Sequence, residues 1–328
     1  MRQVALRAFA VFALGLHGAC WPAPALRAQD WPSKPIRIIV PFPPGGTTDQ
    51  IARQVQPRLE QDLKATIVIE NRGGASGSIG TQAAAFSPPD GTTFLMVFDT
   101  HAVNPSLQPN LPFDTLKDLA PIMLIGKSPM VITAHPTASY KSFADVVAAS
   151  RKTPGSAVYG TIGVGSLAHL AMSQIANKLE VTMTHVPYKG GGPLTTDAIG
   201  GHVPVAIASI ALLSPHIRAG ALRPLAVTSP KRSAQVPDTP TIAEVSVPGF
   251  GAEAWWGFLA PAKTPSTIIA RMNAALGKAL QDPAVRKSLS EQGLEYELST
   301  PDAFGLFLGN EISRWAKVVK DNKVVAGD

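Results

Sequence analysis

Glycine-rich turns are the features of this 328-residue sequence whose residue types and spacing best suit a binding site. Gly45-Gly46 follows the apolar run IRIIVPF, Gly73-Gly74 follows ATIVIEN, and residues 163–166 follow SAVYGTI. Each turn leads into a helix-like segment, where free backbone N–H groups and the positive end of the helix dipole attract anions. The turns therefore predict an anion site at helix N-termini.

Two segments come close to nucleotide-binding motifs without completing them. IGKS at 125–128 resembles the end of a P-loop, but the first glycine of that motif would fall at Pro121. GVGSLA at 163–168 has the spacing of a dinucleotide fingerprint, but Glu180 is nearer than the usual acidic residue and lies at a helix end. We expect no nucleotide and no other cofactor.

Residues for catalysis or metal binding show no telling arrangement. Residues 74–78 miss the G-x-S-x-G elbow by one position, and the histidines after residue 28 form no H-x-x-x-H or H-E-x-x-H pattern. His169, three residues after Ser166, is either a packed side chain or a ligand contact. Trp255-Trp256 is either core or a stacking surface for a ligand. The sequence favours reversible binding over proton transfer, so we expect neither an enzyme nor a metal site.

Strands and helices alternate along the chain, which indicates βαβ units and an α/β fold. Apolar residues at every fourth position from Ile51 to Leu63 predict one buried face for the first helix. Thr47 and Gln50 have the spacing of a capping box at its start. Phe42 follows the first strand, where open α/β sheets bind ligands in the crevice beyond the strand ends.

The α/β pattern occurs twice, with candidate crossings between the two units near 122–134 and 250–260. A chain that leaves one unit, builds a second and returns forms two lobes joined by a two-strand hinge. We expect residues 29–128 and 250–328 to form the first lobe and residues 129–249 to form the second.

The first 28 residues have the composition of a secretory signal peptide. Arginines precede an apolar stretch that is too short to span a bilayer, and small residues follow it. We expect cleavage after Ala28, with cleavage after Ala25 or a buried N-terminal helix as the alternatives. Cys20, the only cysteine, lies in this segment, so no disulfide is expected in the exported protein.

The charge of the exported protein is close to balanced. Residues 1–28 contain three arginines and no acid, so 26 basic and 23 acidic residues remain, a net charge of +3. The basic residues are dispersed and do not alternate with aromatic residues, so nucleic-acid binding is not expected. A mild positive balance suits an anionic ligand.

Several stretches together resemble the Bug receptors, the extracytoplasmic solute-binding proteins of tripartite tricarboxylate transporters. In order along the chain they are WPSKPIRIIVPFPPGGTTDQIAR, IVIENRGGASGSIGTQ, PDGTTFLM, THAVNPSL, VYGTIGVGSLAHL, HVPYKGGGP, LRPLAVTSPKRS, VPDTPTIAEVSVPGF and RWAKVVK. The resemblance implies a periplasmic protein with the two-lobed fold of periplasmic binding proteins, a Venus flytrap of the type II-like kind. Each lobe would be a mixed β-sheet flanked by helices.

The resemblance also implies capture of a small carboxylate between the lobes and delivery to membrane permease subunits. Backbone amides and ordered waters would hold the carboxylate, with Phe42 covering the ligand. Matched motif by motif, the implied ligand-binding residues are Phe42, Gly46, Thr48, Gly74, Ala75, Ser76, Gly77, Thr100, His101, Thr161, Gly165, Ser166, His169, Tyr188 and Ser209.

One departure from the family pattern bears on the ligand. Members often carry an acidic residue before the serine of VAIASI, whereas this chain has Ala208-Ser209. Without that carboxylate a ligand amine loses its partner, so we expect a di- or tricarboxylate or an aromatic carboxylate rather than an amino acid. Two other functions stay open from sequence: a secreted enzyme acting on a small carboxylic acid, and a co-sensor for the sensor kinase of a two-component system.

Overall fold

The computed structural model describes residues 31–322, 324 and 325, so the expected signal peptide lies outside the described residues. The chain from Pro32 onward forms one compact unit. Within the described part of the chain, no helix is both long enough and apolar enough to cross a bilayer.

The first group of strands forms a mixed sheet in the order β2-β1-β3-β9-β4, with β10 on the other edge of β4. β1 is parallel to β2 and β3, whereas β9 is antiparallel to β3 and β4. The strands are β1 (Ile36–Val40), β2 (Ile67–Asn71), β3 (Thr93–Phe98), β4 (Leu119–Ala134), β9 (Glu253–Pro261) and β10 (Glu295–Tyr296). The helices of this group are α1 (Thr47–Leu63), the 3₁₀ turn η1 (Ala75–Gly77), α2 (Ser78–Ala85), α3 (Thr100–Leu107), α9 (Ser266–Gln281), α10 (Pro283–Glu291) and α11 (Pro301–Asp321).

The second group continues the sheet from β4 in the order β7-β5-β6, with β8 also paired to β4. β5 is parallel to β6 and β7, and β4 is antiparallel to β7 and β8. The strands are β5 (Val158–Thr161), β6 (Thr184–Pro187), β7 (Val205–Ser209) and β8 (Arg223–Val227). The helices are α4 (Phe143–Lys152), α5 (Leu167–Leu179), α6 (Gly191–Ile199), α7 (Ile210–Arg218) and α8 (Ile242–Val245).

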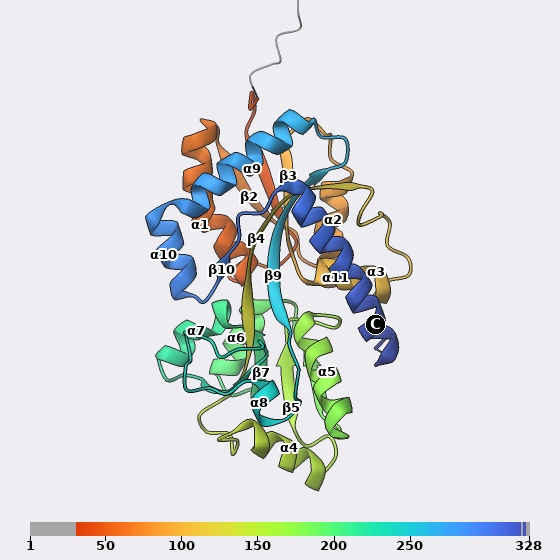
Figure 1. The fold of residues 1–328 in the computed structure, drawn as a ribbon, viewed down its shortest axis with the longest axis vertical. Helices are drawn as coiled ribbons and strands as arrows, with labels where there is room; N and C mark the ends of the chain where they lie inside the picture. The colour runs from red at the N-terminus through yellow and green to blue at the C-terminus, as the bar shows by residue number, and fades with distance from the viewer. Residues whose placement is uncertain (1–30, 323, 326–328) are drawn as a thin grey trace, which may run out of the picture. The chain divides into compact units, whose positions relative to one another are not determined.

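One strand connects the two groups. β4 pairs with β9 from Leu119 to Pro129 and with β7 from Met130 to Ala134, so its partner changes between adjacent residues. Figure 1 shows β4 and β9 running between an upper and a lower set of helices. The lobe boundaries that we expected at residues 128/129 and 249/250 stay a prediction.

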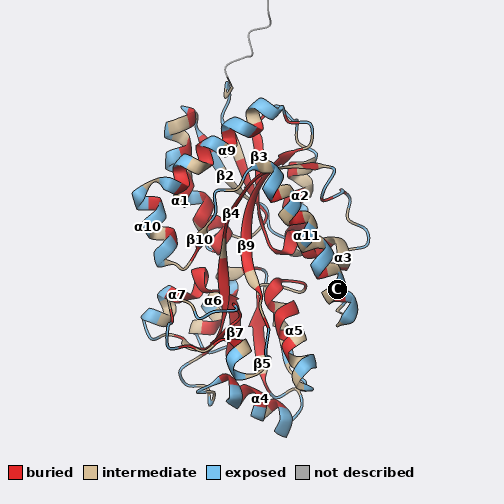
Figure 2. Cartoon of the chain, viewed as in Figure 1, coloured by how far each residue is buried: buried red, intermediate tan, exposed pale blue. Residues whose placement is uncertain are grey.

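The first helix shows how sequence pattern becomes packing. Ile51, Val55 and Leu59 of α1 are fully buried, as their spacing predicted, and Figure 2 shows such buried faces turned toward the sheet. The expected capping box at its start is wrong. Gly46 is the N-cap and makes no side-chain cap, while the Thr47 hydroxyl is hydrogen-bonded to a serine of β7 instead.

The junctions that follow the parallel strands position the site. β1, β3, β5 and β6 each lead through a short connection into α1, α3, α5 and α6 respectively, and β7 runs directly into α7. In α/β sheets the carboxyl ends of such strands border the ligand crevice.

Candidate ligand-binding site

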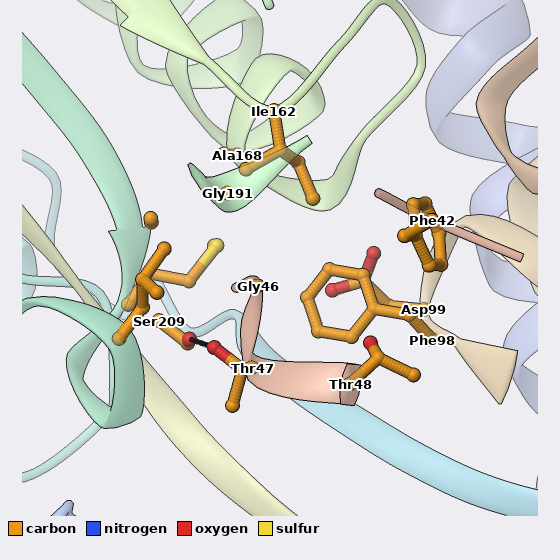
Figure 3. A pocket seen from close by; sticks show the side chains of 13 residues that line it. Phe42, Gly46, Thr47, Thr48, Phe98, Asp99, Ile162, Ala168, Gly191 and Ser209 are labelled. Atoms are coloured by element: carbon orange, nitrogen blue, oxygen red, sulfur yellow. Dashed lines mark hydrogen bonds between the residues drawn. The ribbon is translucent and has the colours of Figure 1, made fainter. Parts of the chain in front are cut away.

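A cavity of about 30 Å³ lies where these strand-to-helix junctions meet, a volume that holds about two water molecules. Figure 3 shows labelled side chains from both strand groups pointing toward it. The lining residues are Phe42, Gly46, Thr47, Thr48, Phe98, Asp99, Met130, Ile162, Ala168, Gly191, Ala208, Ser209 and Leu212.

Helix N-termini surround this cavity. Gly46, Asp99 and Ser209 are the N-caps of α1, α3 and α7. Gly191 is the first residue of α6, and Ala168 is the second residue of α5. The first N–H groups of a helix have no partner within it, and its dipole is positive there. Among the described residues that line the cavity none is Lys, Arg or His, so the backbone supplies the attraction for an anion.

Hydrogen bonds fix the turn between β1 and α1. The Gly45 N–H donates to the Asp49 carboxylate at 3.0 Å, and the Asn71 amide donates to the Phe42 carbonyl at 3.1 Å and to Asp49 at 3.0 Å. Burial opposes the charge of Asp49, but hydrogen bonds from Arg53, Gly45 and Asn71 hold its pKa below the usual value. The turn that carries Phe42 is therefore rigidly attached to the start of α1.

Aromatic rings form one wall of the site. Phe42 meets Phe98 edge to face with centroids 6.1 Å apart, and Phe98 lies 5.0 Å from Trp256. The Trp256 indole N–H donates to the Thr48 hydroxyl at 3.2 Å. Trp255 and Trp256 are fully buried and neither lines the cavity, so the core interpretation of this pair is confirmed.

The η1 turn lies beside the cavity without lining it. Ala75 and Ser76 adopt left-handed backbone conformations with φ of 46° and 52°. The Ser76 hydroxyl donates to the Val164 carbonyl at 3.0 Å, which ties this turn to the junction between β5 and α5. A Cβ on Gly77 would lie 3.3 Å from the tip of Phe42. The η1 turn therefore supports both Phe42 and the junction between β5 and α5.

A pair of stacked histidines supports the start of α5. The rings of His169 and His185 are 4.0 Å apart, and the Thr161 hydroxyl is hydrogen-bonded to His185 at 2.7 Å. The Gly165 backbone N–H donates to His169 Nδ1 at 3.1 Å. The backbone N–H of His169 donates to the Ser166 hydroxyl at 3.3 Å. Burial lowers the pKa of His169 to about 4 and that of His185 to about 3, so both rings are neutral at pH 7.

The remaining expected site residues lie behind the lining. Thr100 and His101 begin α3 and are buried, and burial lowers the pKa of His101 to about 3. The Tyr188 hydroxyl donates to Asp197 at 2.9 Å. Among the described residues, no group of three or more His, Cys, Asp or Glu side chains is arranged to hold a metal ion.

Four of the expected residues, Phe42, Gly46, Thr48 and Ser209, line the cavity. The direct or water-mediated roles of the other eleven in ligand binding stay predictions. Sequence reasoning missed Asp99 and Gly191, although each had a signal: Asp99 ends a strand as Phe42 does, and Gly191 lies in a GGG run. Met130 and Leu212 carried no signal, because they reach the cavity only through the pairing of β4 with β7.

These features define a two-lobed α/β protein of the periplasmic binding class, in which helix N-termini meet around a small cavity. The family model described as "Tripartite tricarboxylate transporter family receptor" matches residues 51–324, and the chain belongs to this family. The fold class and the recognition of the Bug receptors from sequence are thus confirmed. The protein is a solute-binding receptor and not an enzyme.

Three similar proteins illustrate the relationship. BugT of Bordetella pertussis is 37% identical over 317 residues, covering 96% of this chain and 97% of BugT. The structure of R. palustris Rpa4515 with adipate has a TM-score of 0.87 and 33% identity, over 90% of this chain and 100% of that one. The structure of MatC from Rhodopseudomonas palustris with malate has a TM-score of 0.83 and 30% identity, over 88% of this chain and 100% of that one.

Proposed function

We propose that this protein is a periplasmic receptor that captures a small carboxylate in the cavity and delivers it to the permease subunits of a tripartite tricarboxylate transporter. The observation that carries the proposal is the convergence of helix N-termini on a cavity whose described lining holds no basic side chain. A carboxylate there would accept hydrogen bonds from backbone N–H groups. Each bond to a charged acceptor contributes about 1.5–3 kcal/mol.

Closure of two lobes around the ligand is part of the proposal. Residues 29–128 and 250–328 would form one lobe and residues 129–249 the other, and the change of partner along β4 supports this division. The Thr47 and Ser209 hydroxyls, 3.3 Å apart, would bridge the lobes when no ligand lies between them. A cavity of about 30 Å³ is smaller than a dicarboxylate. The lobes must therefore separate to admit one, with β4 and β9 as the hinge.

The comparisons support the ligand class and the location. Adipate and malate, the ligands named for two similar structures, are small dicarboxylates. Membership of a transporter receptor family supports the permease as partner, and the leader-like residues 1–28 support export and cleavage after Ala28. Phe42, Gly46, Thr48 and Ser209 would contact the ligand directly, and the other expected residues would act behind them.

Calorimetric titration of the purified protein against a panel of small molecules tests the proposal. The panel contains acetate, succinate, malate, adipate, citrate and benzoate, with 1,4-diaminobutane as a cation of comparable length. At least one carboxylate is expected to bind with one-to-one stoichiometry, and the diamine is expected not to bind. Absence of binding by every carboxylate, or equal binding of the diamine, would contradict the proposal.

A further inference from the structure

Asp99 is a feature of the cavity that anion binding by backbone groups does not explain. Among the described lining residues it alone carries an ionisable side chain. It is fully buried, and neither carboxyl oxygen has a hydrogen-bond partner. Figure 3 shows its two oxygens pointing past the Phe98 ring into the cavity. A buried polar group without a partner is costly, so this carboxyl calls for a partner on the ligand.

The surroundings of Asp99 favour the neutral carboxyl. Burial raises its pKa well above the usual value, and the charge of Glu311 on α11 raises it further. The N–H groups of Leu167 and Thr100 oppose this shift in pKa, but neither forms a hydrogen bond of normal geometry with the carboxyl. A neutral carboxyl can turn its carbonyl oxygen toward these N–H groups and leave its O–H for the cavity.

Among the described residues, no side-chain cation lies beside Asp99 to stabilise a carboxylate at this position. His101 on α3 and His169 on α5 are neutral, because burial lowers their pKa values to about 3 and about 4. On α1 the Arg53 guanidinium is already paired with the Asp49 carboxylate at 3.0 Å. Apart from the helix N-termini, whose partial positive charge favours a carboxylate, the charged groups on the described elements around Asp99 oppose its ionisation or leave it unaffected.

The positive charge of the helix N-termini indicates which ligand group would pair with Asp99. A ligand ammonium would require an ionised Asp99 and would itself be repelled by the positive N-termini around the cavity. A ligand carboxylate is attracted by the same N-termini and accepts the hydrogen that a neutral carboxyl donates.

We propose that Asp99 in its neutral form donates a hydrogen bond to the second carboxylate of a dicarboxylate, whose first carboxylate lies at the N-termini of α1 and α7. This inference rests on the proposed function and makes Asp99 the residue that selects diacids. Figure 3 places Thr47 and Ser209 on one side of the cavity and Asp99 on the other. The apolar Ile162 and Phe98 side chains contribute to the lining and suit the carbon chain of such a ligand.

Two series of ligands with matched chain length test this assignment by calorimetry. The six-carbon series is adipate, hexanoate and 6-aminohexanoate, and the four-carbon series is succinate, butyrate and 4-aminobutyrate. In the series that fits, the wild-type protein should bind the diacid at least about tenfold more tightly than the monoacid, since one charge-assisted hydrogen bond is added. The amino acid should bind no better than the monoacid.

Two variants separate a donor role from a structural one. Asp99→Asn keeps an N–H donor of similar size and should retain the preference for the diacid. Asp99→Leu removes the donor and should bind the diacid no more tightly than the monoacid. As the pH rises and Asp99 ionises, the preference should decline in the wild type but not in Asp99→Asn.

The outcomes distinguish this inference from the proposed function. Tighter binding of the amino acid than of the diacid, or an unchanged diacid preference in Asp99→Leu, overturns the role of Asp99 while leaving carboxylate binding in place. Monoacid and diacid binding of equal strength to the wild type overturns it as well. Failure of every carboxylate to bind the wild type overturns the proposed function itself.

Discussion

Thr48 links the cavity to the core through a single hydroxyl. It lines the cavity, and it also accepts the hydrogen bond from the indole N–H of the fully buried Trp256 at 3.2 Å. Trp256 is fully buried, so loss of this acceptor leaves a buried donor unsatisfied. Such a loss costs about 1–3 kcal/mol.

The variant Thr48→Val should therefore lower the free energy of unfolding by about 1–3 kcal/mol, because valine has the shape of threonine without the acceptor. Thr48→Ser keeps the hydroxyl and is the matched control. Urea denaturation followed by far-UV circular dichroism measures both. A Val variant as stable as the Ser variant would show that this hydrogen bond contributes nothing to stability.

At the scale of single residues, strand position and motif matching each led sequence reasoning to a residue that lines the cavity. Phe42 could be placed at the site because it comes at the end of an apolar run, and Ser209 because it matches a motif of the Bug receptors; both line the cavity. Asp99 has the same position after β3 but was missed. Its importance depends on two facts that the sequence does not show. The Asp99 carboxyl is fully buried without a hydrogen-bond partner, and it is affected by the charge of Glu311 on α11, which is far away in the sequence.

At the scale of elements, the stacked histidines of β6 and α5 make the stability of the protein depend on pH. His169 and His185 carry lowered pKa values, about 4 and about 3, first because both rings are buried and for His185 also because His169 is adjacent. In the unfolded chain both take up protons near the ordinary value of about 6.5. Their contribution to stability is therefore complete above pH 6.5 and is lost progressively as the pH falls toward 3–4.

We expect His185→Gln to reduce this loss, because one histidine with a lowered pKa is removed and His169 no longer faces a second ring. The free energy of unfolding at pH 7.5 minus that at pH 4.5, from urea titrations, should be smaller in this variant than in the wild type. His202→Gln removes an exposed histidine and serves as the control. An equal difference in wild type and His185→Gln would refute the role of the stack.

The periodic elements were predictable and the special contacts were not. The stripe from Ile51 to Leu63 gave the inward face of α1, because helix periodicity is a local property. The capping box at Thr47 failed because the Thr47 hydroxyl has a distant partner, Ser209, that competes with the local cap. By contrast, Ser142 forms a capping box with Asp145 at the start of α4.

At the scale of the whole molecule, the proposed ligand binding depends on two glycine turns, those of Gly46 and Gly191, that lie close to each other. Gly46 has an extended backbone that any residue adopts, with φ −78° and ψ 165°. A Cβ at this position would lie 3.7 Å from the Gly191 nitrogen, an ordinary contact. Alanine therefore fits, whereas the two further methyl groups of valine would press on the Gly191 backbone or fill the cavity.

The central claim is that a carboxylate binds among the helix N-termini of this cavity. The most direct test is calorimetric titration of wild type, Gly46→Ala and Gly46→Val with the carboxylate from the panel that binds the wild type most tightly. Gly46→Ala should bind nearly as the wild type does. Gly46→Val should bind at least about tenfold more weakly, a loss of about 1.4 kcal/mol or more, at an unchanged melting temperature. Wild-type affinity in Gly46→Val would contradict the placement of the ligand in this cavity.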